Sequence, residues 1–165
     1  MQRWGLTPSW SNKLISNARG ETVAEKPSFK SAFKARRCII PASGFFEWKT
    51  ENKVKQPFYI SFKSGDLMAF AGIWETWGDT ETCCIITTSP NSLMEPIHDR
   101  MPVILDASNW EQWLSPAERE VEKLLPLIRP HDADSMQAWA VSREVNKVGA
   151  KNDDALIASI THSLF

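Results

Sequence analysis

The stretch 38-CIIPASGFFEWKTENKVKQPFYISFKSGDLMAFAGIWETWGDTETCCIITT-88 decides the fold. Aromatic and β-branched residues recur in it in short runs, and residues that favour turns separate these runs. This spacing is typical of strands in an antiparallel sheet or barrel. We therefore expect strands at 38–41, 45–49, 58–63, 68–74 and 83–88, turns at 43–44, 64–66 and 78–79, and a loop at 50–56.

Upstream of this stretch, the sequence predicts an extended segment over 3–10 and then two short helices. The helices are expected near 18–25 and 29–35, because Pro27 separates them and Ser28 can cap the second.

Downstream of the stretch, helical signals return. A helix over 107–114 is expected after a capping Asp106. Ser115, with Pro116 and Glu118 after it, marks the start of another helix. Its apolar stripe consists of Val121, Leu124, Leu125 and Ile128. With a last strand over 139–142, the fold class is α+β, mainly antiparallel and barrel-like with peripheral helices. No repeat or linker interrupts the chain, so a single domain over 1–165 is expected.

The charges are distributed unevenly along the chain. Residues 1–63 carry a formal charge of +8, and the remaining residues carry −9, which together give the net charge of −1. A polyanionic partner bound by the first third explains this division. A basic and an acidic solvated face that balance each other explain it equally well.

Several function classes lack their sequence signals. No apolar run reaches the roughly 18–20 residues that span a bilayer, and no leader-like segment opens the chain, so a cytoplasmic protein without membrane contact is expected. Cys38, Cys83 and Cys84 lie in apolar surroundings, which favours buried thiols. There is no Cys/His metal motif or Gly-rich phosphate loop, so no metal or cofactor is expected.

Two residues have the chemistry of proton transfer. Glu47 lies between Phe46 and Trp48, and lost solvation there raises the pKa of a carboxyl group. The competing interpretation is the ordinary alternation of side chains along a strand, in which Phe46 and Trp48 point inward and Glu47 points into water. His98 lies in a Pro-bracketed loop beside Asp99 and Arg100, which can fix an imidazole tautomer or bind a phosphate.

Further candidate residues lie in the basic segment 1–63 and at the end of one expected strand. Asn17 can hydrogen-bond near a reacting oxygen, and Arg19 can hold a phosphate, unless the pair is only a helix cap with a solvated Arg. Thr87 ends a strand and can bond a DNA backbone. Among eight tryptophans, the rings of Trp4, Trp10 and Trp48 are candidates for stacking on unpaired bases, although core packing is the default for most.

Several segments together resemble the SRAP family in order and spacing, from Arg3 to about Asn152. The most specific are N-A-R-x-E-T at 17–22, G-x-x-E-W at 44–48 and I-H-D-R-M-P at 97–102. Others are R-W-G-L-T-P-S-W at 3–10, R-C-I-I-P at 37–41, Q-P-F-Y at 56–59, A-G-I-W at 71–74, I-I-T-T at 85–88 and V-S at 141–142.

The resemblance implies processing of abasic sites in single-stranded DNA. Members of the family remove their initiator Met, and the exposed Cys forms a Schiff base and then a thiazolidine with the ring-opened sugar. This implies peptidase and lyase chemistry within the DNA damage (SOS) response. Glu47 and His98 would then manage protons, and Asn17 would orient the amine or the sugar. Arg3, Trp4, Arg19 and Thr87 would contact the DNA.

The sequence departs from the family at its start. Members begin Met-Cys-Gly-Arg, whereas Gln2 follows Met1 here, and all three cysteines are internal. The resemblance therefore implies that the nucleophile is missing, through truncation, degeneration or separate encoding of an N-terminal piece. Whether the chain is an enzyme stays open. The alternatives are a non-catalytic domain that binds single-stranded DNA and a β-rich domain that binds another protein. A monomer is expected.

Overall fold

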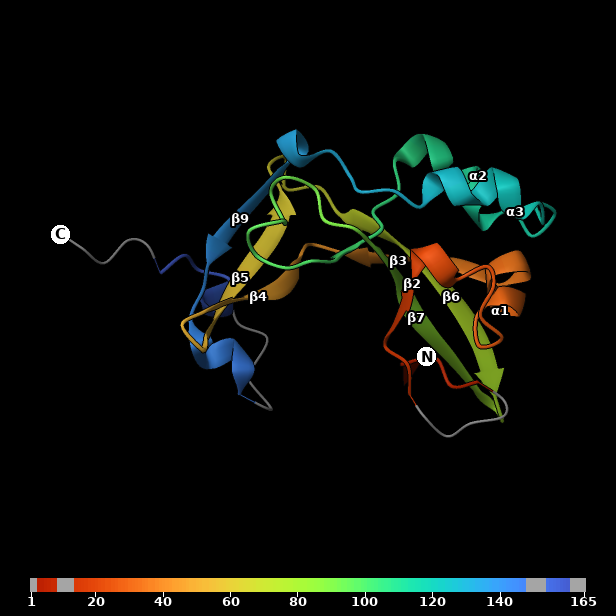
Figure 1. Cartoon of the computed structure of the whole chain (residues 1–165), viewed down its shortest axis with the longest axis horizontal. Helices are drawn as coiled ribbons and strands as arrows, with labels where there is room; N and C mark the ends of the chain where they lie inside the picture. Colours follow the sequence, from red (N-terminus) through yellow and green to blue (C-terminus); the bar gives the residue numbers. More distant parts are fainter. Residues whose placement is uncertain (1–2, 9–13, 148–153, 161–165) are drawn as a thin grey trace. The chain divides into compact units, whose positions relative to one another are not determined.

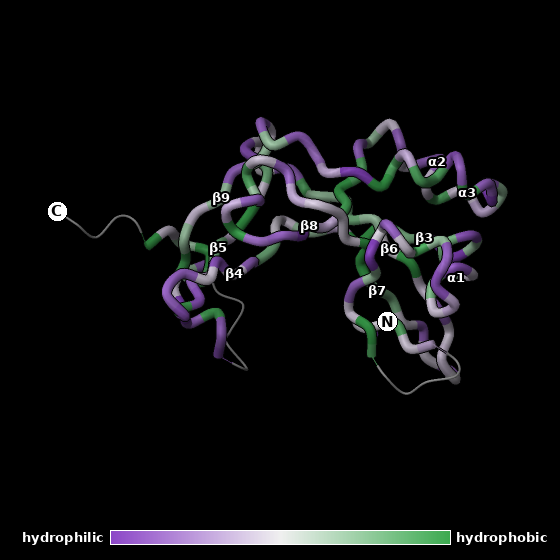
Figure 2. The backbone as a smooth tube through the Cα atoms, in the orientation of Figure 1, coloured by the Kyte–Doolittle hydropathy of each residue, from purple (hydrophilic) through white to green (hydrophobic). Residues whose placement is uncertain are grey.

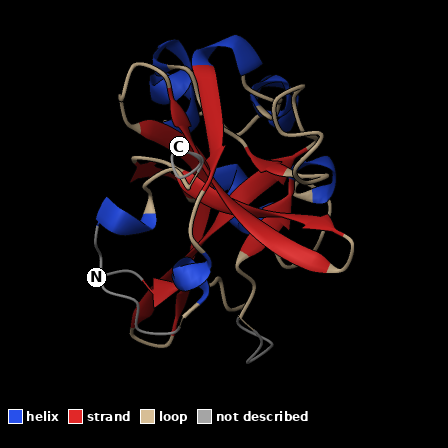
Figure 3. Cartoon of the chain, turned by 90° about the vertical axis from the view of Figure 1, so that its left-hand side faces the viewer, coloured by secondary structure: helices blue, strands red, loops and turns tan. Residues whose placement is uncertain are grey.

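The computed structural model describes residues 3–8, 14–147 and 154–160. Strands in two sheets account for more of it than the short helices do, so the α+β class is confirmed (Figures 1 and 3). Residue contacts divide the chain into two compact units, made up of residues 1–41, 69–89 and 100–131 in the first, and of residues 42–68, 90–99 and 132–165 in the second. The single domain stays a prediction. In the described ranges no helix has the length and apolarity that crossing a membrane requires.

The first unit is built on a six-stranded sheet in the order β1-β7-β6-β3, with β2 and β8 also paired to β7. The strands are β1 (Arg3–Trp4), β2 (Asn17–Arg19), β3 (Arg37–Ala42), β6 (Met68–Trp77), β7 (Thr80–Thr88) and β8 (Met101–Pro102). Both β1 and β2 run parallel to β7, whereas β6 and β8 run antiparallel to it. The aromatic and β-branched composition of β6 and β7 suits this central position, where most of their side chains are buried.

Short helices cover the apolar side chains of this sheet. They are η1 (Gly20–Thr22), α1 (Lys30–Ala35), η2 (Ala107–Asn109), α2 (Trp110–Leu114), α3 (Val121–Leu124) and η3 (Leu125–Leu127). Hydrophobic and hydrophilic segments alternate along α2 and α3 (Figure 2). The core joins Phe33 of α1, Ile73 and Ile86 of the sheet, Trp113 of α2 and Leu124 of α3.

Arg37 fixes the helices to the sheet. It is only 7% exposed, yet its side chain donates five hydrogen bonds to carbonyl oxygens, so every guanidinium N–H has a partner. The acceptors are the carbonyl groups of Phe33, Lys34, Trp113, Ser115 and Glu118, at 2.6–2.9 Å. The buried charge is thereby satisfied by backbone carbonyl groups at the end of α1, at the end of α2 and in the segment before α3.

The second unit contains a three-stranded antiparallel sheet in the order β4-β5-β9. Its strands are β4 (Phe45–Glu51), β5 (Val54–Phe62) and β9 (Met136–Ala140), and its short helices are η4 (Ala133–Ser135), η5 (Arg143–Asn146) and η6 (Asp154–Leu156). The Tyr59 ring lies 5.2 Å from the ring centroids of both Phe46 and Trp139, which packs one face of this sheet.

The loop expected at 50–56 is wrong. Strands β4 and β5 continue into that stretch and are joined by a tight turn at Asn52 and Lys53, whose φ angles are 49° and 65°. Such a turn needs two left-handed residues; Asn52 favours that conformation, but Lys53 stands where a glycine is usual, so the hairpin was not predicted. The last strand lies at Met136–Ala140 instead of 139–142.

Several helix expectations also need correction. The helix near 18–25 is wrong, because Asn17–Arg19 forms a strand on β7 and only a short 3₁₀ turn follows. The helix over 29–35 is confirmed, but Ser28 does not cap it. The helix over 107–114 is confirmed as η2 and α2, although the Asp106 side chain accepts no capping bond. The helix marked by Ser115 begins only at Val121.

Candidate functional site

Glu47 lies in the middle of β4, opposite Phe58 of β5. Its side chain is 24% exposed, so it does not simply point into water as strand alternation allows. Burial raises the pKa of the Glu47 carboxyl group, and the nearby Asp99 adds to this effect. His98 and the backbone N–H of Trp48, which donates to Glu47 Oε2 at 3.4 Å, act in the opposite direction. The direction of the pKa shift predicted from the sequence is confirmed.

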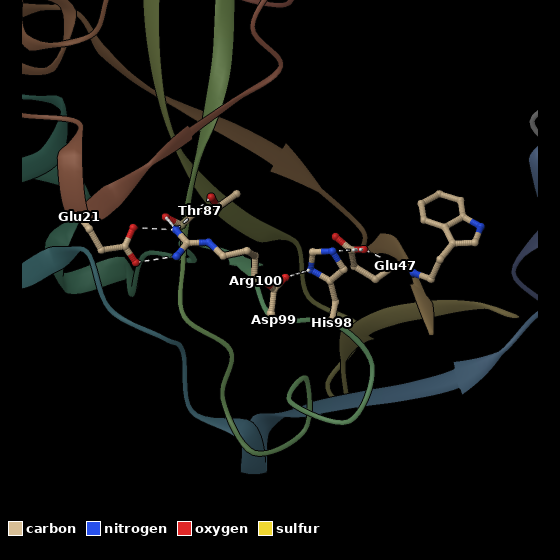
Figure 4. A network of polar contacts seen from close by, with 7 residues as sticks. Glu21, Glu47, Thr87, His98, Asp99 and Arg100 are labelled. Carbon is tan, nitrogen blue, oxygen red and sulfur yellow. Dashed lines mark hydrogen bonds and ion pairs between the residues drawn. The ribbon is translucent and has the colours of Figure 1, made fainter. Parts of the chain in front are cut away.

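His98 meets Glu47 within the second unit (Figure 4). Its Nε2 lies 3.9 Å from Oε2 of Glu47, and its Nδ1 lies 3.4 Å from Oδ1 of Asp99. The imidazole is 39% exposed, so a ligand can reach it. A partly buried carboxyl group with a raised pKa, next to an imidazole, is a pair that can pass a proton to or from a reacting group near neutral pH.

Arg100 belongs to a second polar cluster, which lies in the first unit (Figure 4). Its guanidinium makes two bonds to the Glu21 carboxylate, at 2.6 and 2.9 Å, and donates to the carbonyl oxygen of Thr87 at 2.6 Å. This pairing, more than any other contact, lowers the pKa of Glu21. Glu21 and Thr88 also line a pocket of about 220 Å³. The clamp between Glu21 and Arg100 was missed in the sequence, although both residues lie in the motifs that carry the resemblance.

The remaining candidates occupy the edge of the first unit's sheet. Arg3 and Trp4 form β1, and Asn17 and Arg19 flank the buried Ala18 in β2. All four are exposed, Trp4 at 47%. Arg19 lies opposite Thr87, whose hydroxyl donates to the carbonyl oxygen of Ala18 at 3.4 Å.

The structure thus gathers the sequence candidates into two groups. Glu47 and His98 meet in the second unit, whereas Asn17, Arg19 and Thr87 meet on strands β2 and β7 of the first. Arg3 and Trp4 pair with β7 further along the same strand. Trp10 and His162 lie outside the described residues.

The thiols are poor nucleophiles. Cys83 and Cys84 are buried, Cys38 is half-buried, and all three are free. Burial raises the pKa of Cys38 and of Cys84 to about 12, and it raises the pKa of Cys83 as well. Since the thiolate is the reactive form, these residues are structural members of the strands, as their surroundings in the sequence predict.

Comparison with known families agrees with the motif pattern. The family profile described as SOS response associated peptidase (SRAP) matches residues 1–148. The chain belongs to the SRAP family. Its members among curated proteins include the abasic site processing protein YoqW of Bacillus subtilis, which is 50% identical over 156 residues, covering 87% of this chain and 69% of the relative. The abasic site processing protein HMCES of Xenopus tropicalis is 32% identical, covering 96% of this chain and 56% of that protein.

Solved structures with 26–35% sequence identity to this chain share its fold. A crystal structure of a protein from Bacteroides thetaiotaomicron superposes with a TM-score of 0.85 at 35% identity, covering 94% of this chain and 74% of that one. A Bordetella bronchiseptica protein gives a TM-score of 0.76 at 26% identity, with coverage of 86% and 76%. The likeness to both extends over most of this chain.

Proposed function

We propose that this chain binds single-stranded DNA and processes abasic sites in it, with Glu47 and His98 as its proton-transferring pair. The observation that carries the proposal is the 3.9 Å approach of the two side chains, in a member of a family whose curated relatives are named abasic site processing proteins. The raised pKa of Glu47 supports the assignment, because a carboxylic acid that keeps its proton toward neutral pH can donate it.

The chemistry of an abasic site calls for such a pair. The ring-opened sugar presents an aldehyde, and an amine that adds to it forms a carbinolamine. Loss of water from the carbinolamine then gives the Schiff base. One group must protonate the departing hydroxyl, and another must accept a proton from the nitrogen. Glu47 in its acid form supplies the first proton, and His98 accepts the second. The half-buried thiol of Cys38 and the buried thiols of Cys83 and Cys84 have no role in these steps.

The first unit supplies the features that a single strand needs. Arg3 and Arg19 are exposed cations on the edge strands β1 and β2, and the indole of Trp4 presents a flat face for stacking. Each phosphate that a cation neutralises releases counterions. Arg19→Gln is therefore expected to weaken binding to any sequence and to lower the slope of log affinity against log salt by about 0.7. Arg129→Gln, which removes an exposed cation already paired with Asp106, serves as the control.

The test of the proposed reaction compares three single-stranded oligonucleotides: undamaged, with one abasic site, and with a tetrahydrofuran analogue that has no aldehyde. Borohydride reduction traps a Schiff base, and a denaturing gel separates the trapped complex. We expect trapping only with the abasic oligonucleotide, and we expect Glu47→Gln to slow it by about 10²-fold or more.

Glu51→Gln is the matched control for this experiment. Glu51 lies on the same strand, 66% exposed and paired with Lys49, so its loss should leave trapping unchanged. Equal binding of the three oligonucleotides without trapping would overturn the processing role in favour of a non-catalytic DNA-binding domain. Absence of DNA binding would overturn both.

A further inference from the structure

His98 is carried by a loop, residues 90–99, that contains neither helix nor strand. Two successive turns give this loop its form. The carbonyl oxygen of Asn91 accepts the backbone N–H groups of Met94 at 3.1 Å and Glu95 at 2.9 Å. The carbonyl oxygen of Met94 in turn accepts those of Ile97 at 2.8 Å and His98 at 2.9 Å. The backbone of His98 is thereby tied to Asn91 through Met94.

The side chain of Asn91 closes the first of these turns. Its Oδ1 accepts the N–H of Met94 at 3.0 Å, in the manner of an N-cap residue, and its Nδ2 donates to Sδ of Met136 at 3.3 Å. Met94 and Met136 are 0% and 1% exposed, so the amide is joined at both ends to the interior of the second unit. Met136 is the first residue of β9, which pairs with β5.

This anchoring matters because Glu47 and His98 are carried by different kinds of structure. Glu47 lies in the ladder of hydrogen bonds between β4 and β5. His98 lies in a loop outside that ladder, and its imidazole is 39% exposed. At 3.9 Å the interaction with Glu47 would be lost after a small shift of the loop.

We infer that Asn91 is a positioning residue: its side chain holds the 90–99 loop so that His98 stays beside Glu47. That this positioning serves proton transfer rests on the proposed function, whereas the positioning itself can be measured without DNA. An Asn91 that only stabilises the fold would affect the whole unit and would leave the interaction between Glu47 and His98 intact whenever the protein is folded.

A measurement without DNA separates the two roles. Selective ¹³C labelling of the histidine and tyrosine rings gives a separate NMR signal for each ring. The His98 signal responds to a carboxyl group that lies 3.9 Å from its Nε2. In the parent chain, Glu47→Gln should therefore shift the His98 signal. Tyr59, the one tyrosine of the sequence, is 6% exposed and packs against Phe46 and Trp139 in the second unit, so its signal reports on the integrity of that unit.

The expected result is that Glu47→Gln loses its effect on the His98 signal in the Asn91→Ala background, while the Tyr59 signal stays unchanged. Asn91→Asp keeps the acceptor for the Met94 N–H and should restore the effect. Met136→Leu removes only the sulfur acceptor of the Asn91 amide, so it tests the other end of the anchor. We expect it to retain most of the effect, because the turn keeps its own hydrogen bond.

Three outcomes would overturn the inference. One is an undiminished effect of Glu47→Gln in Asn91→Ala. Another is a joint change of the His98 and Tyr59 signals in Asn91→Ala, which indicates general loosening of the second unit. The third is no effect of Glu47→Gln in the parent chain, since there would then be no pair to position. None of them depends on DNA binding, so they are distinguishable from failure of the proposed function.

Discussion

The strongest stability prediction concerns Arg37, whose five donors all reach carbonyl oxygens while the residue is 7% exposed. In Arg37→Lys, three donors replace five, so at least two of the buried or partly buried carbonyl groups lose their hydrogen bond to this side chain. An unsatisfied buried acceptor costs about 1–3 kcal/mol, which places the loss of unfolding free energy at about 3 kcal/mol. For a chain of this length the midpoint of thermal unfolding should fall by about 6–12 °C.

The neighbouring arginine provides the control. Arg36 bonds Glu75 at 2.7 Å and Ser31 at 3.1 Å, with its side chain 26% exposed. A lysine can keep the ion pair with Glu75, so Arg36→Lys should cost about 1 kcal/mol or less. Urea unfolding followed by circular dichroism measures both variants. If Arg37→Lys cost no more than Arg36→Lys, the complete use of the Arg37 donors would not matter for stability, and the reasoning would be refuted.

Three further predictions follow from contacts described above. The Glu21 pKa is lowered by Arg100, so its contribution is present above the unfolded pKa of about 4.5 and is lost as pH falls below it. In urea titrations, Glu21→Gln should cost about 1 kcal/mol or less at pH 7, and this cost should decrease as the pH falls through the folded pKa of Glu21; a cost that does not change with pH would contradict this. The Glu47 pKa is raised by burial, so its ionised form destabilises the fold as pH rises through that value. Glu47→Gln should therefore raise the thermal midpoint near pH 8 and leave it unchanged near pH 4, and a lower midpoint near pH 8 would contradict the assignment. A Cβ on Gly44 would lie 2.4 Å from the carbonyl oxygen of Ile60, so Gly44→Ala should cost about 1–3 kcal/mol in urea unfolding, and an unchanged unfolding free energy would contradict this.

The strands were predictable where their residues have a strong local preference. The runs ending in Thr88 and Trp74 are apolar and β-branched over their length, and the structure places them at the centre of a sheet. Asn17–Arg19 was not predictable in the same way. Its three residues carry no strand signal of their own, and they are extended because β7, nearly seventy residues later, offers them a partner.

The late start of the helix after Ser115 has a related cause. Ser115, Pro116 and Glu118 have the composition of a helix start, yet the carbonyl oxygens of Ser115 and Glu118 accept hydrogen bonds from Arg37. The Ser115 carbonyl also accepts the N–H of Glu118 at 3.3 Å, so a single turn forms there, and α3 begins only at Val121. Local capping rules do not include a hydrogen-bond partner that is distant in the sequence.

For the candidate site, the sequence indicated which residues have useful chemistry but not which of them meet. Glu47 and His98 are 51 positions apart in the sequence, and their side chains approach to 3.9 Å. His98 reaches this position on the 90–99 loop, in which the Asn91 side chain bonds the N–H of Met94. The ion pair between Glu21 and Arg100 joins the motif at 17–22 to the motif at 97–102. From the sequence alone these motifs are separate, and Arg100 is expected to bind a phosphate or to fix the imidazole of His98.

The parallel attachment of β1 and β2 to β7 bears on how the protein is made. On the ribosome, Arg3 and Asn17 emerge long before Thr82 and Ile85, the residues that they face in the finished sheet. The segments that form β1 and β2 cannot pair with β7 until β7 has left the exit tunnel, and pairings over such a sequence distance also form slowly. The edge that carries Arg19 is therefore among the last parts of its sheet to form during translation, and a nascent chain stalled before Thr88 would not yet have it.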